Sequence, residues 1–138
     1  KMAKQSYGRI INMSSVSGLR AGVGRTAYGT SKAAIIGLTR QIALEMGPHS
    51  ITANAIAPGP IVTPLTEANY TDETISRLLP MIPVGRFGNC SDIAEAVCYL
   101  ANPKTGYVNG ELLTVDGGYF SAGMTQTGNL DLSAGETN

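Results

Sequence analysis

Two side chains near the start of one predicted helix could move a proton. Tyr28 and Lys32 lie four residues apart, so a helix that begins near Thr26 would bring them to one face. A tyrosine with an ordinary pKa of about 10 is a poor acid–base catalyst at neutral pH, but a nearby cation favours the phenolate. The pair therefore suits proton transfer to or from a substrate oxygen. On its own this spacing is common on ordinary helix surfaces.

A serine precedes this pair at the end of a predicted strand. The β-branched run 9–13 leads into Ser14 and Ser15, which is typical of a buried parallel strand. Ligands of open parallel sheets bind beyond the carboxyl ends of the strands. The Ser15 hydroxyl could therefore bond the substrate oxygen that Tyr28 serves. The alternative is that both serines only satisfy backbone groups where the chain leaves the strand.

A second strand end carries a different pattern. The predicted strand 51–57 runs into Pro58-Gly59-Pro60, and Thr63 follows shortly after. A glycine here would let the backbone approach a flat ring, with a hydroxyl just beyond it. The alternative is a plain strand-to-loop turn, because Pro-Gly is common in turns.

The elements that would hold these residues alternate between strands and helices. We expect strands at 9–13, 51–57 and 111–115, and helices at 26–46 and from an N-cap at Ser91 to Ala101. The polar segment 63–83 would be a partly helical flap. On helix 26–46 the face toward the core is predicted to carry Ala27, Ala34, Leu38 and Ile42, with Ala43 or Met46.

This alternation predicts an α/β fold, a parallel sheet with helices on its faces. The domain would span residues 1–120, followed by a polar tail, 121–138. Three strands are few for such a sheet, and the first would leave an apolar edge unpaired.

Composition excludes several classes of function. Ten basic residues balance ten acidic ones among the 138, which gives no electrostatic footprint for nucleic acid or an anionic membrane. No apolar run is long enough to span a membrane. Cys90 and Cys98 lack the spacing of a metal site or redox pair. We therefore expect a soluble cytoplasmic protein with no metal, no nucleic-acid partner and no membrane partner.

Together these segments resemble the short-chain dehydrogenase/reductase family. The matching stretches are 8–18, 27–37, 54–63 and 109–119, and they agree in order and spacing. The resemblance is to the C-terminal half of a member similar to 3-oxoacyl-carrier-protein reductases. It implies half of a doubly wound, Rossmann-type parallel sheet with flanking helices.

The resemblance also implies chemistry: reversible hydride transfer between NAD or NADP and a small carbonyl/alcohol substrate. Tyr28 would be the proton donor or acceptor, Lys32 would favour its ionised form and bind the nicotinamide ribose, and Ser15 would orient the substrate. The other cofactor-binding residues would be Pro58 and Gly59 along the nicotinamide, and Ile61 and Thr63 at its carboxamide.

One pattern resembles the pyrophosphate loop of the family, but we interpret it differently. Gly18, Gly22 and Gly24 have suitable spacing between a strand and a helix. However, the next strand does not end in the acid or arginine that would bind the ribose. We predict that these glycines belong to the loop beside the substrate. The pyrophosphate loop would then precede Lys1, and the 138-residue chain alone would be inactive.

Family members use the equivalents of helix 26–46 and of the last strand as subunit contacts, so the resemblance implies a homodimer or homotetramer. Small residues on this helix would permit close helix packing, namely Gly29, Thr30, Ala33 and Gly37. The alternative function is a non-catalytic piece that assembles with another half or with copies of itself.

Overall fold

Three parallel strands form the centre of the structure, a computed structural model that describes residues 1–122. They lie side by side in the order β1-β2-β3, with both pairings parallel. The strands are β1 (Gly8–Met13), β2 (Ile51–Pro58) and β3 (Leu112–Val115). The predicted α/β class, with a parallel sheet and flanking helices, is confirmed.

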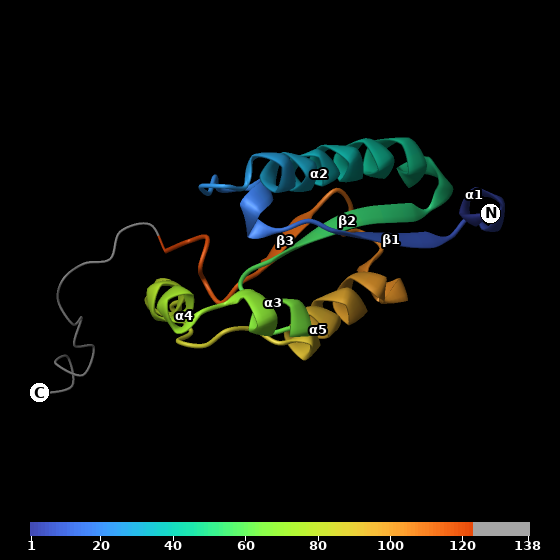
Figure 1. Ribbon diagram of the computed structural model, residues 1–138. Helices are drawn as coiled ribbons and strands as arrows, with labels where there is room; N and C mark the ends of the chain where they lie inside the picture. The colour runs from blue at the N-terminus through green and yellow to red at the C-terminus, as the bar shows by residue number, and fades with distance from the viewer. Residues whose placement is uncertain (123–138) are drawn as a thin grey trace, which may run out of the picture.

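Helices cover both faces of this sheet (Figure 1). The long helix α2 packs on one face, and α5 contacts all three strands from the other. The α-helices are α1 (Met2–Gln5), α2 (Thr26–Met46), α3 (Pro64–Asn69), α4 (Asp72–Leu78) and α5 (Cys90–Ala101). Four short 3-10 turns complete the described elements: η1 (Val16–Gly18), η2 (Gly47–His49), η3 (Leu79–Met81) and η4 (Pro103–Thr105).

Burial differs between the central strand and its neighbour. β2 is buried over seven of its eight residues, from Ile51 to Ala57. The first strand was expected to be buried, but most of β1 is only half-buried. The reason is its position: β1 is an edge strand, and it pairs only with β2 from Gly8↔Ile51 to Met13↔Ile56. The expected unpaired edge is therefore present among the described residues.

The core lies between the sheet and α5. Ile56 from β2 packs with Ala96 and Leu100 from α5, and Leu100 is only 1% exposed. Partly buried apolar residues surround this cluster: Ile11, Ile93, Val97, Val108, Leu113 and Val115. Burial of each large aliphatic side chain contributes about 1.5–3 kcal/mol.

The predicted inner face of α2 is only partly right, because Ala43 is buried as one of the two options but Leu38 is not. The buried residues are Ile36, Thr39 and Ala43, whereas Leu38 is 54% exposed. Apolar residues surround this helix on every side, so periodicity alone does not select a face. Thr39 is buried because its hydroxyl donates to the Ile35 carbonyl at 2.7 Å and accepts from Asn12 at 2.9 Å.

The predicted N-cap of α5 is wrong. Asn89, not Ser91, precedes the helix, and its side-chain oxygen accepts from the Asp92 N–H at 3.0 Å. The Asp92 carboxylate in return accepts from the Asn89 N–H at 2.8 Å. This reciprocal capping box satisfies two free N–H groups, and a cap at Ser91 would forgo it.

Two asparagine side chains, Asn54 and Asn109, tie distant parts of the chain to β2; of the two, only Asn54 is buried. The Asn54 side chain donates to the Val108 carbonyl at 2.9 Å and accepts from the Glu111 N–H at 3.0 Å. Asn109 accepts from the Ala53 N–H at 2.9 Å and donates to the Ala43 carbonyl at 3.0 Å. These bonds hold the entry to β3 against both β2 and α2. The predicted tail, 121–138, lies outside the described residues except for its first two.

Candidate active site

The carboxyl ends of β1 and β2 open into one cavity. The start of α2, the end of β1 and α3 lie at the same end of the sheet (Figure 1). The cavity there has a volume of about 930 Å³. Six of the seven predicted site residues line it: Ser15, Tyr28, Pro58, Gly59, Ile61 and Thr63. This position is where ligands bind in open α/β sheets.

Lys32, the seventh predicted residue, lies beside the Tyr28 ring and does not line the cavity. Its Nζ donates to the Met13 carbonyl at 3.0 Å, at the end of β1. The same Nζ lies 5.6 Å from the centroid of the Tyr28 ring. The ammonium is therefore held against β1 and beside the phenol, whose side chain is 42% exposed.

Ser15 is buried at the entrance to η1. Its Oγ accepts from the Ser17 N–H at 3.1 Å, so it caps this short turn. The backbone role weighed as an alternative is therefore real, but an accepting hydroxyl still has its own proton to donate. The neighbouring Ser14 Oγ donates to the Lys32 carbonyl at 2.8 Å, which ties the end of β1 to α2.

Close backbone packing explains one glycine of the apparent phosphate-binding pattern. A Cβ on Gly18 would lie 2.7 Å from the carbonyl carbon of Lys32. A Cβ on Gly29 would lie 2.9 Å from the Ser17 carbonyl oxygen. Glycine at both positions lets η1 pack directly against α2, which brings Ser15 toward Tyr28. This packing accounts for Gly18 without a bound phosphate.

Gly59 also has a packing reason. A Cβ there would lie 2.6 Å from the Asp116 Cβ, just beyond the end of β3. The Gly59 N–H donates to the Val115 carbonyl at 3.0 Å, so the chain continues along β3 past its last strand residue. Pro58 and Gly59 thus form a stretch of the cavity wall on which Gly59 presents no side chain.

Thr63 has a capping role that the sequence analysis missed. It is the N-cap of α3, where its Oγ1 accepts from the Thr66 N–H at 3.2 Å. Its own N–H donates to the Thr66 Oγ1 at 2.8 Å. The spacing of threonines at 63 and 66, with Pro64 at the first helical position, was the signal for this capping box.

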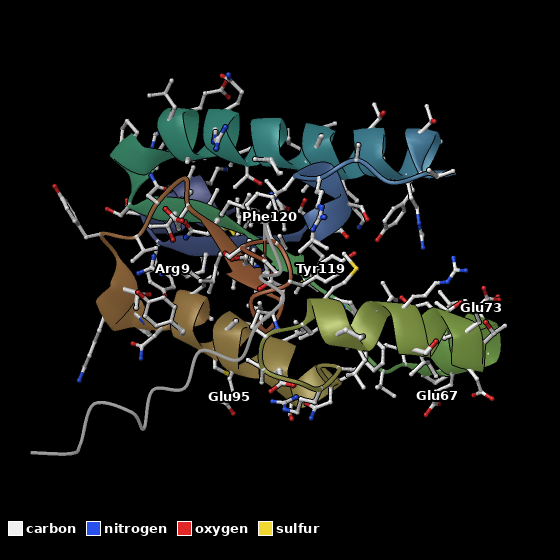
Figure 2. All side chains as sticks on the ribbon, turned by 90° about the vertical axis from the view of Figure 1, so that its left-hand side faces the viewer. Arg9, Glu67, Glu73, Glu95, Tyr119 and Phe120 are labelled. Carbon is white, nitrogen blue, oxygen red and sulfur yellow. The ribbon has the colours of Figure 1, made fainter. Side chains whose placement is uncertain are left out.

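Several further residues line the cavity and were not predicted as site residues, among them Arg20, Arg25, Tyr70 and Tyr119. The arginines lie in the loop that the sequence analysis placed beside the substrate, so charge within that loop was the available signal. Tyr119 reaches the cavity from the segment after β3, between α2 and the layer of α3 and α4 (Figure 2).

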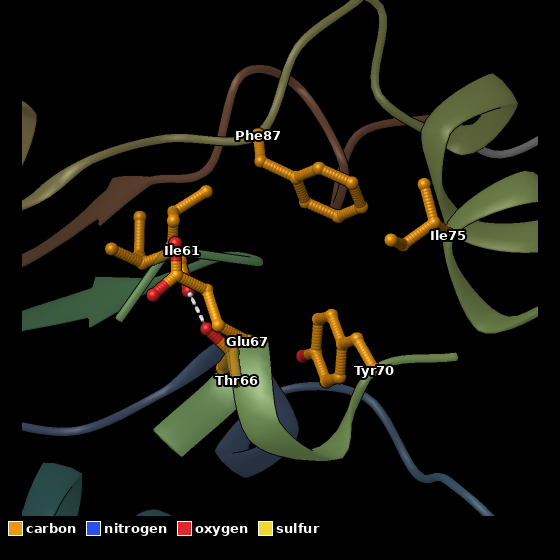
Figure 3. Close-up of a pocket in the computed structure, with 7 residues that line it drawn as sticks. Ile61, Thr66, Glu67, Tyr70, Ile75 and Phe87 are labelled. Carbon is orange, nitrogen blue, oxygen red and sulfur yellow. Dashed lines mark hydrogen bonds between the residues drawn. The ribbon is translucent and has the colours of Figure 1, made fainter. Parts of the chain in front are cut away.

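A smaller apolar pocket adjoins the cavity (Figure 3). It has a volume of about 200 Å³ and shares Ile61, Thr66 and Tyr70 with the larger cavity. The rings of Tyr70 and Phe87 lie 6.1 Å apart and tilted. The Thr66 Oγ1 donates to the Ile61 carbonyl at 2.8 Å, which joins α3 to the end of β2.

Outside the cavity, one ion pair follows the segment 63–83. Arg86 binds the Asp92 carboxylate through two hydrogen bonds, of 2.8 and 2.9 Å. The Arg86 guanidinium, and then the Asn89 N–H, lower the pKa of Asp92 from 3.8 to about 2.

The described chain contains no helix long and apolar enough to cross a membrane. Among the same residues, no group of three or more acidic, histidine or cysteine side chains could hold a metal ion.

Comparison with known proteins identifies the family. The family model described as enoyl-(acyl carrier protein) reductase matches residues 1–120. The short-chain reductase protein NovJ of Streptomyces niveus is 44% identical over 123 residues, which cover 85% of this chain and 47% of NovJ. The 3-oxoacyl-[acyl-carrier-protein] reductase FabG of Aquifex aeolicus is 42% identical over 120 residues, 87% of this chain and 48% of FabG.

The chain spans about half the length of these curated relatives. The solved structure of ElxO with NADP bound superposes with a TM-score of 0.77 at 35% identity, covering 87% of this chain and 49% of ElxO. Sequence and architecture agree, and the chain belongs to the short-chain dehydrogenase/reductase family.

Proposed function

We propose that this chain carries the catalytic half of an oxidoreductase that transfers hydride reversibly between NAD or NADP and a carbonyl/alcohol substrate. The observation that carries the proposal is the shared cavity. Ser15 from the end of β1, Tyr28 from α2 and the backbone of Pro58 and Gly59 all line it. A proton donor, an orienting hydroxyl and a stretch of backbone without a side chain at Gly59 thus surround one space.

In this proposal Tyr28 gives a proton to the carbonyl oxygen during reduction and takes it back during oxidation. The Lys32 ammonium, 5.6 Å from the ring centroid, stabilises the negative charge that remains on the phenol oxygen. The Ser15 hydroxyl donates a hydrogen bond to the same substrate oxygen and so holds the carbonyl in position. A positioned acid of this kind contributes about 10²–10⁴-fold in rate.

The nicotinamide coenzyme supplies or accepts the hydride when it is bound. The wall at Pro58 and Gly59 would let an aromatic ring approach the backbone, because Gly59 has no side chain, and Ile61 and Thr63 line the cavity beyond it, where they would bind a carboxamide. Lys32 would bind the ribose. The choice of NADP as one of the two coenzymes is supported by ElxO, a relative whose solved structure has NADP bound.

The proposal includes inactivity of the 138-residue chain alone. The described sheet has three strands, and the pyrophosphate-binding half expected from the family would lie on the far side of β1. The test compares this chain with a full-length version that supplies that half, by following oxidation of NADPH and NADH with carbonyl substrates. Turnover is expected only in the full-length version. Turnover by the isolated chain would disprove this part of the proposal.

The intact protein is proposed to be a homodimer or homotetramer through α2 and β3. Leu38 and Leu44 on α2 are 54% and 75% exposed, and a side chain at Gly37 would meet open space. An apolar outer face of this kind suits a subunit contact. Light scattering of the full-length version would measure the oligomeric state, and a monomer would contradict it.

The free edge of β1 favours one alternative, a non-catalytic piece that assembles with another half or with copies of itself. Mixing this chain with a separately produced upstream half would distinguish the two. Assembly without any oxidation of NADPH or NADH would support the alternative, and recovery of activity would support the enzyme.

A further inference from the structure

Two arginines give the cavity a positive wall beside the proposed proton donor. Arg20 and Arg25 line the cavity, and its lining among the described residues includes no aspartate, glutamate or lysine. The guanidinium carbon of Arg25 lies 5.5 Å from the centroid of the Tyr28 ring. A positive charge therefore lies beside the ring of the residue proposed to donate the proton.

Neither arginine is neutralised by an acid in the described part of the chain. The two ion pairs found there are Arg77–Glu73 and Arg86–Asp92, both outside this wall. Glu67 lines the smaller adjoining pocket (Figure 3) but not the cavity itself, and Glu95 points outward from α5 (Figure 2). Two positive charges thus face a cavity without a matching negative charge on its wall.

Aromatic rings support both guanidinium groups. Arg25 lies over the ring of Tyr28. The guanidinium carbon of Arg20 lies 5.7 Å from the centroid of the Tyr119 ring, in the segment after β3. A guanidinium over a ring face still has its in-plane N–H groups free, and these match the two oxygens of a carboxylate or phosphate. The cavity therefore offers hydrogen-bond donors arranged for a planar or tetrahedral anion.

We propose that the substrate carries an anionic group, a carboxylate or a phosphate, which Arg20 and Arg25 bind while its carbonyl lies at Ser15 and Tyr28. This inference rests on the proposed function and adds the substrate class. It makes the two arginines specificity-determining residues: they select among carbonyl/alcohol substrates by charge, and the proton transfer stays with Tyr28.

The test is a binding measurement that needs neither coenzyme nor turnover. The 138-residue chain is titrated with D-gluconate, with glycerol 3-phosphate and with sorbitol, and the NMR shifts of the 15–28 segment are followed. Gluconate and sorbitol differ chiefly by the carboxylate. We expect at least one anion to bind about fivefold more tightly than sorbitol, since each exposed charge pair contributes about 0.5 kcal/mol. The preferred anion distinguishes carboxylate from phosphate.

Substitutions assign this preference to the arginines. The double variant Arg20→Gln/Arg25→Gln should bind all three compounds equally, and Arg20→Lys/Arg25→Lys should recover only part of the preference, because lysine keeps the charge but not the planar set of N–H groups. Arg40→Gln, an exposed position on α2 that does not line the cavity, is the matched control and should keep it. Equal binding of sorbitol, absence of binding by all three probes, or a preference that survives the double glutamine variant would each overturn the inference. Failure of hydride transfer in the full-length version would leave the binding result unchanged, so the two proposals can fail separately.

Discussion

The two walls of the cavity are held by different kinds of contact. On the wall from β1 and α2, side-chain hydrogen bonds join residues far apart in sequence. Lys32 to Met13 spans 19 residues and Ser14 to Lys32 spans 18. On the opposite wall, the side-chain bonds described for 63–81 reach at most five residues along the chain, as in Thr66 to Ile61.

This difference separates the wall that holds the proposed catalytic groups from the wall that contacts the rest of the substrate. The long-range bonds hold α2 against β1, so the distance between Ser15 and Tyr28 depends on the sheet itself. Proton transfer requires such precision, because displacements of about 1 Å can cost about 10²-fold in rate. The local bonds of α3 and α4 mainly stabilise each short helix, and the bond from Thr66 to Ile61 reaches only the segment just beyond β2. Changes in that wall can therefore alter which substrate binds without moving the catalytic groups.

The largest expected effect contrasts two tyrosines, one on each wall. Tyr28→Phe in the full-length version should lower kcat/KM by about 10²–10⁴-fold, because the substrate oxygen loses its proton donor. Tyr70→Phe, on the wall formed by α3, should change it by less than about tenfold, because Tyr70 lines the cavity without a proposed part in proton transfer. Initial rates with NADPH measure both variants.

Circular dichroism and coenzyme affinity serve as controls for these two proteins. Equal losses in the two variants would mean that the walls do not differ in function. A fully active Tyr28→Phe protein would remove Tyr28 from the proposed mechanism.

A stability comparison tests the contacts themselves. Asn54 is 1% exposed and bonds to Val108 and Glu111, which lie 54 and 57 residues away. Asn54→Ala removes both bonds of a buried side chain and leaves the Val108 carbonyl and the Glu111 N–H without these partners, so the free energy of unfolding should fall by about 3 kcal/mol. Thr71→Ala, which removes the exposed N-cap of α4, should cost about 1 kcal/mol or less.

Urea titrations of the full-length version measure both free energies. The informative quantity is the difference between the two variants, because it compares a long-range contact with a local one. If Thr71→Ala destabilised the protein as much as Asn54→Ala, the wall formed by α3 and α4 would be as strongly coupled to the sheet as the catalytic wall.

The same contrast explains what the sequence could predict. The order of strands and helices followed from β-branched runs, helix spacing and turn residues, and the six predicted residues around the cavity all come from strand ends or the start of α2. The inner face of α2 was partly mispredicted because Thr39 is buried through its bond to Asn12, 27 residues earlier. No local pattern reveals a partner that distant.

Arg20 and Arg25 were missed for a related reason. Arginines in a glycine-rich loop have no periodicity that indicates where they point. The two guanidinium groups are placed by the rings of Tyr119 and Tyr28, which belong to different parts of the fold. The N-cap at Asn89 was, by contrast, a local signal, since Asp92 completes its capping box three residues later.

The smallest expected effect concerns the ion pair that follows the locally bonded wall. Arg86 lowers the pKa of Asp92 from 3.8 to about 2, so the folded state favours the ionised carboxylate. This contribution to stability is present above about pH 4 and is lost as the pH falls toward about 2. Arg86→Gln should therefore lower Tm slightly at about pH 6, and the difference in Tm from the unmodified protein should close as the pH approaches 2.

Arg77→Gln is the control. It breaks the exposed pair with Glu73 on α4 and should change Tm little at any pH, because such pairs contribute little. Thermal unfolding at several pH values measures both variants. A gap for Arg86→Gln that widens under acid conditions would contradict the assigned direction, whereas a closing gap would show that Arg86 stabilises the folded state through the ionised Asp92 carboxylate.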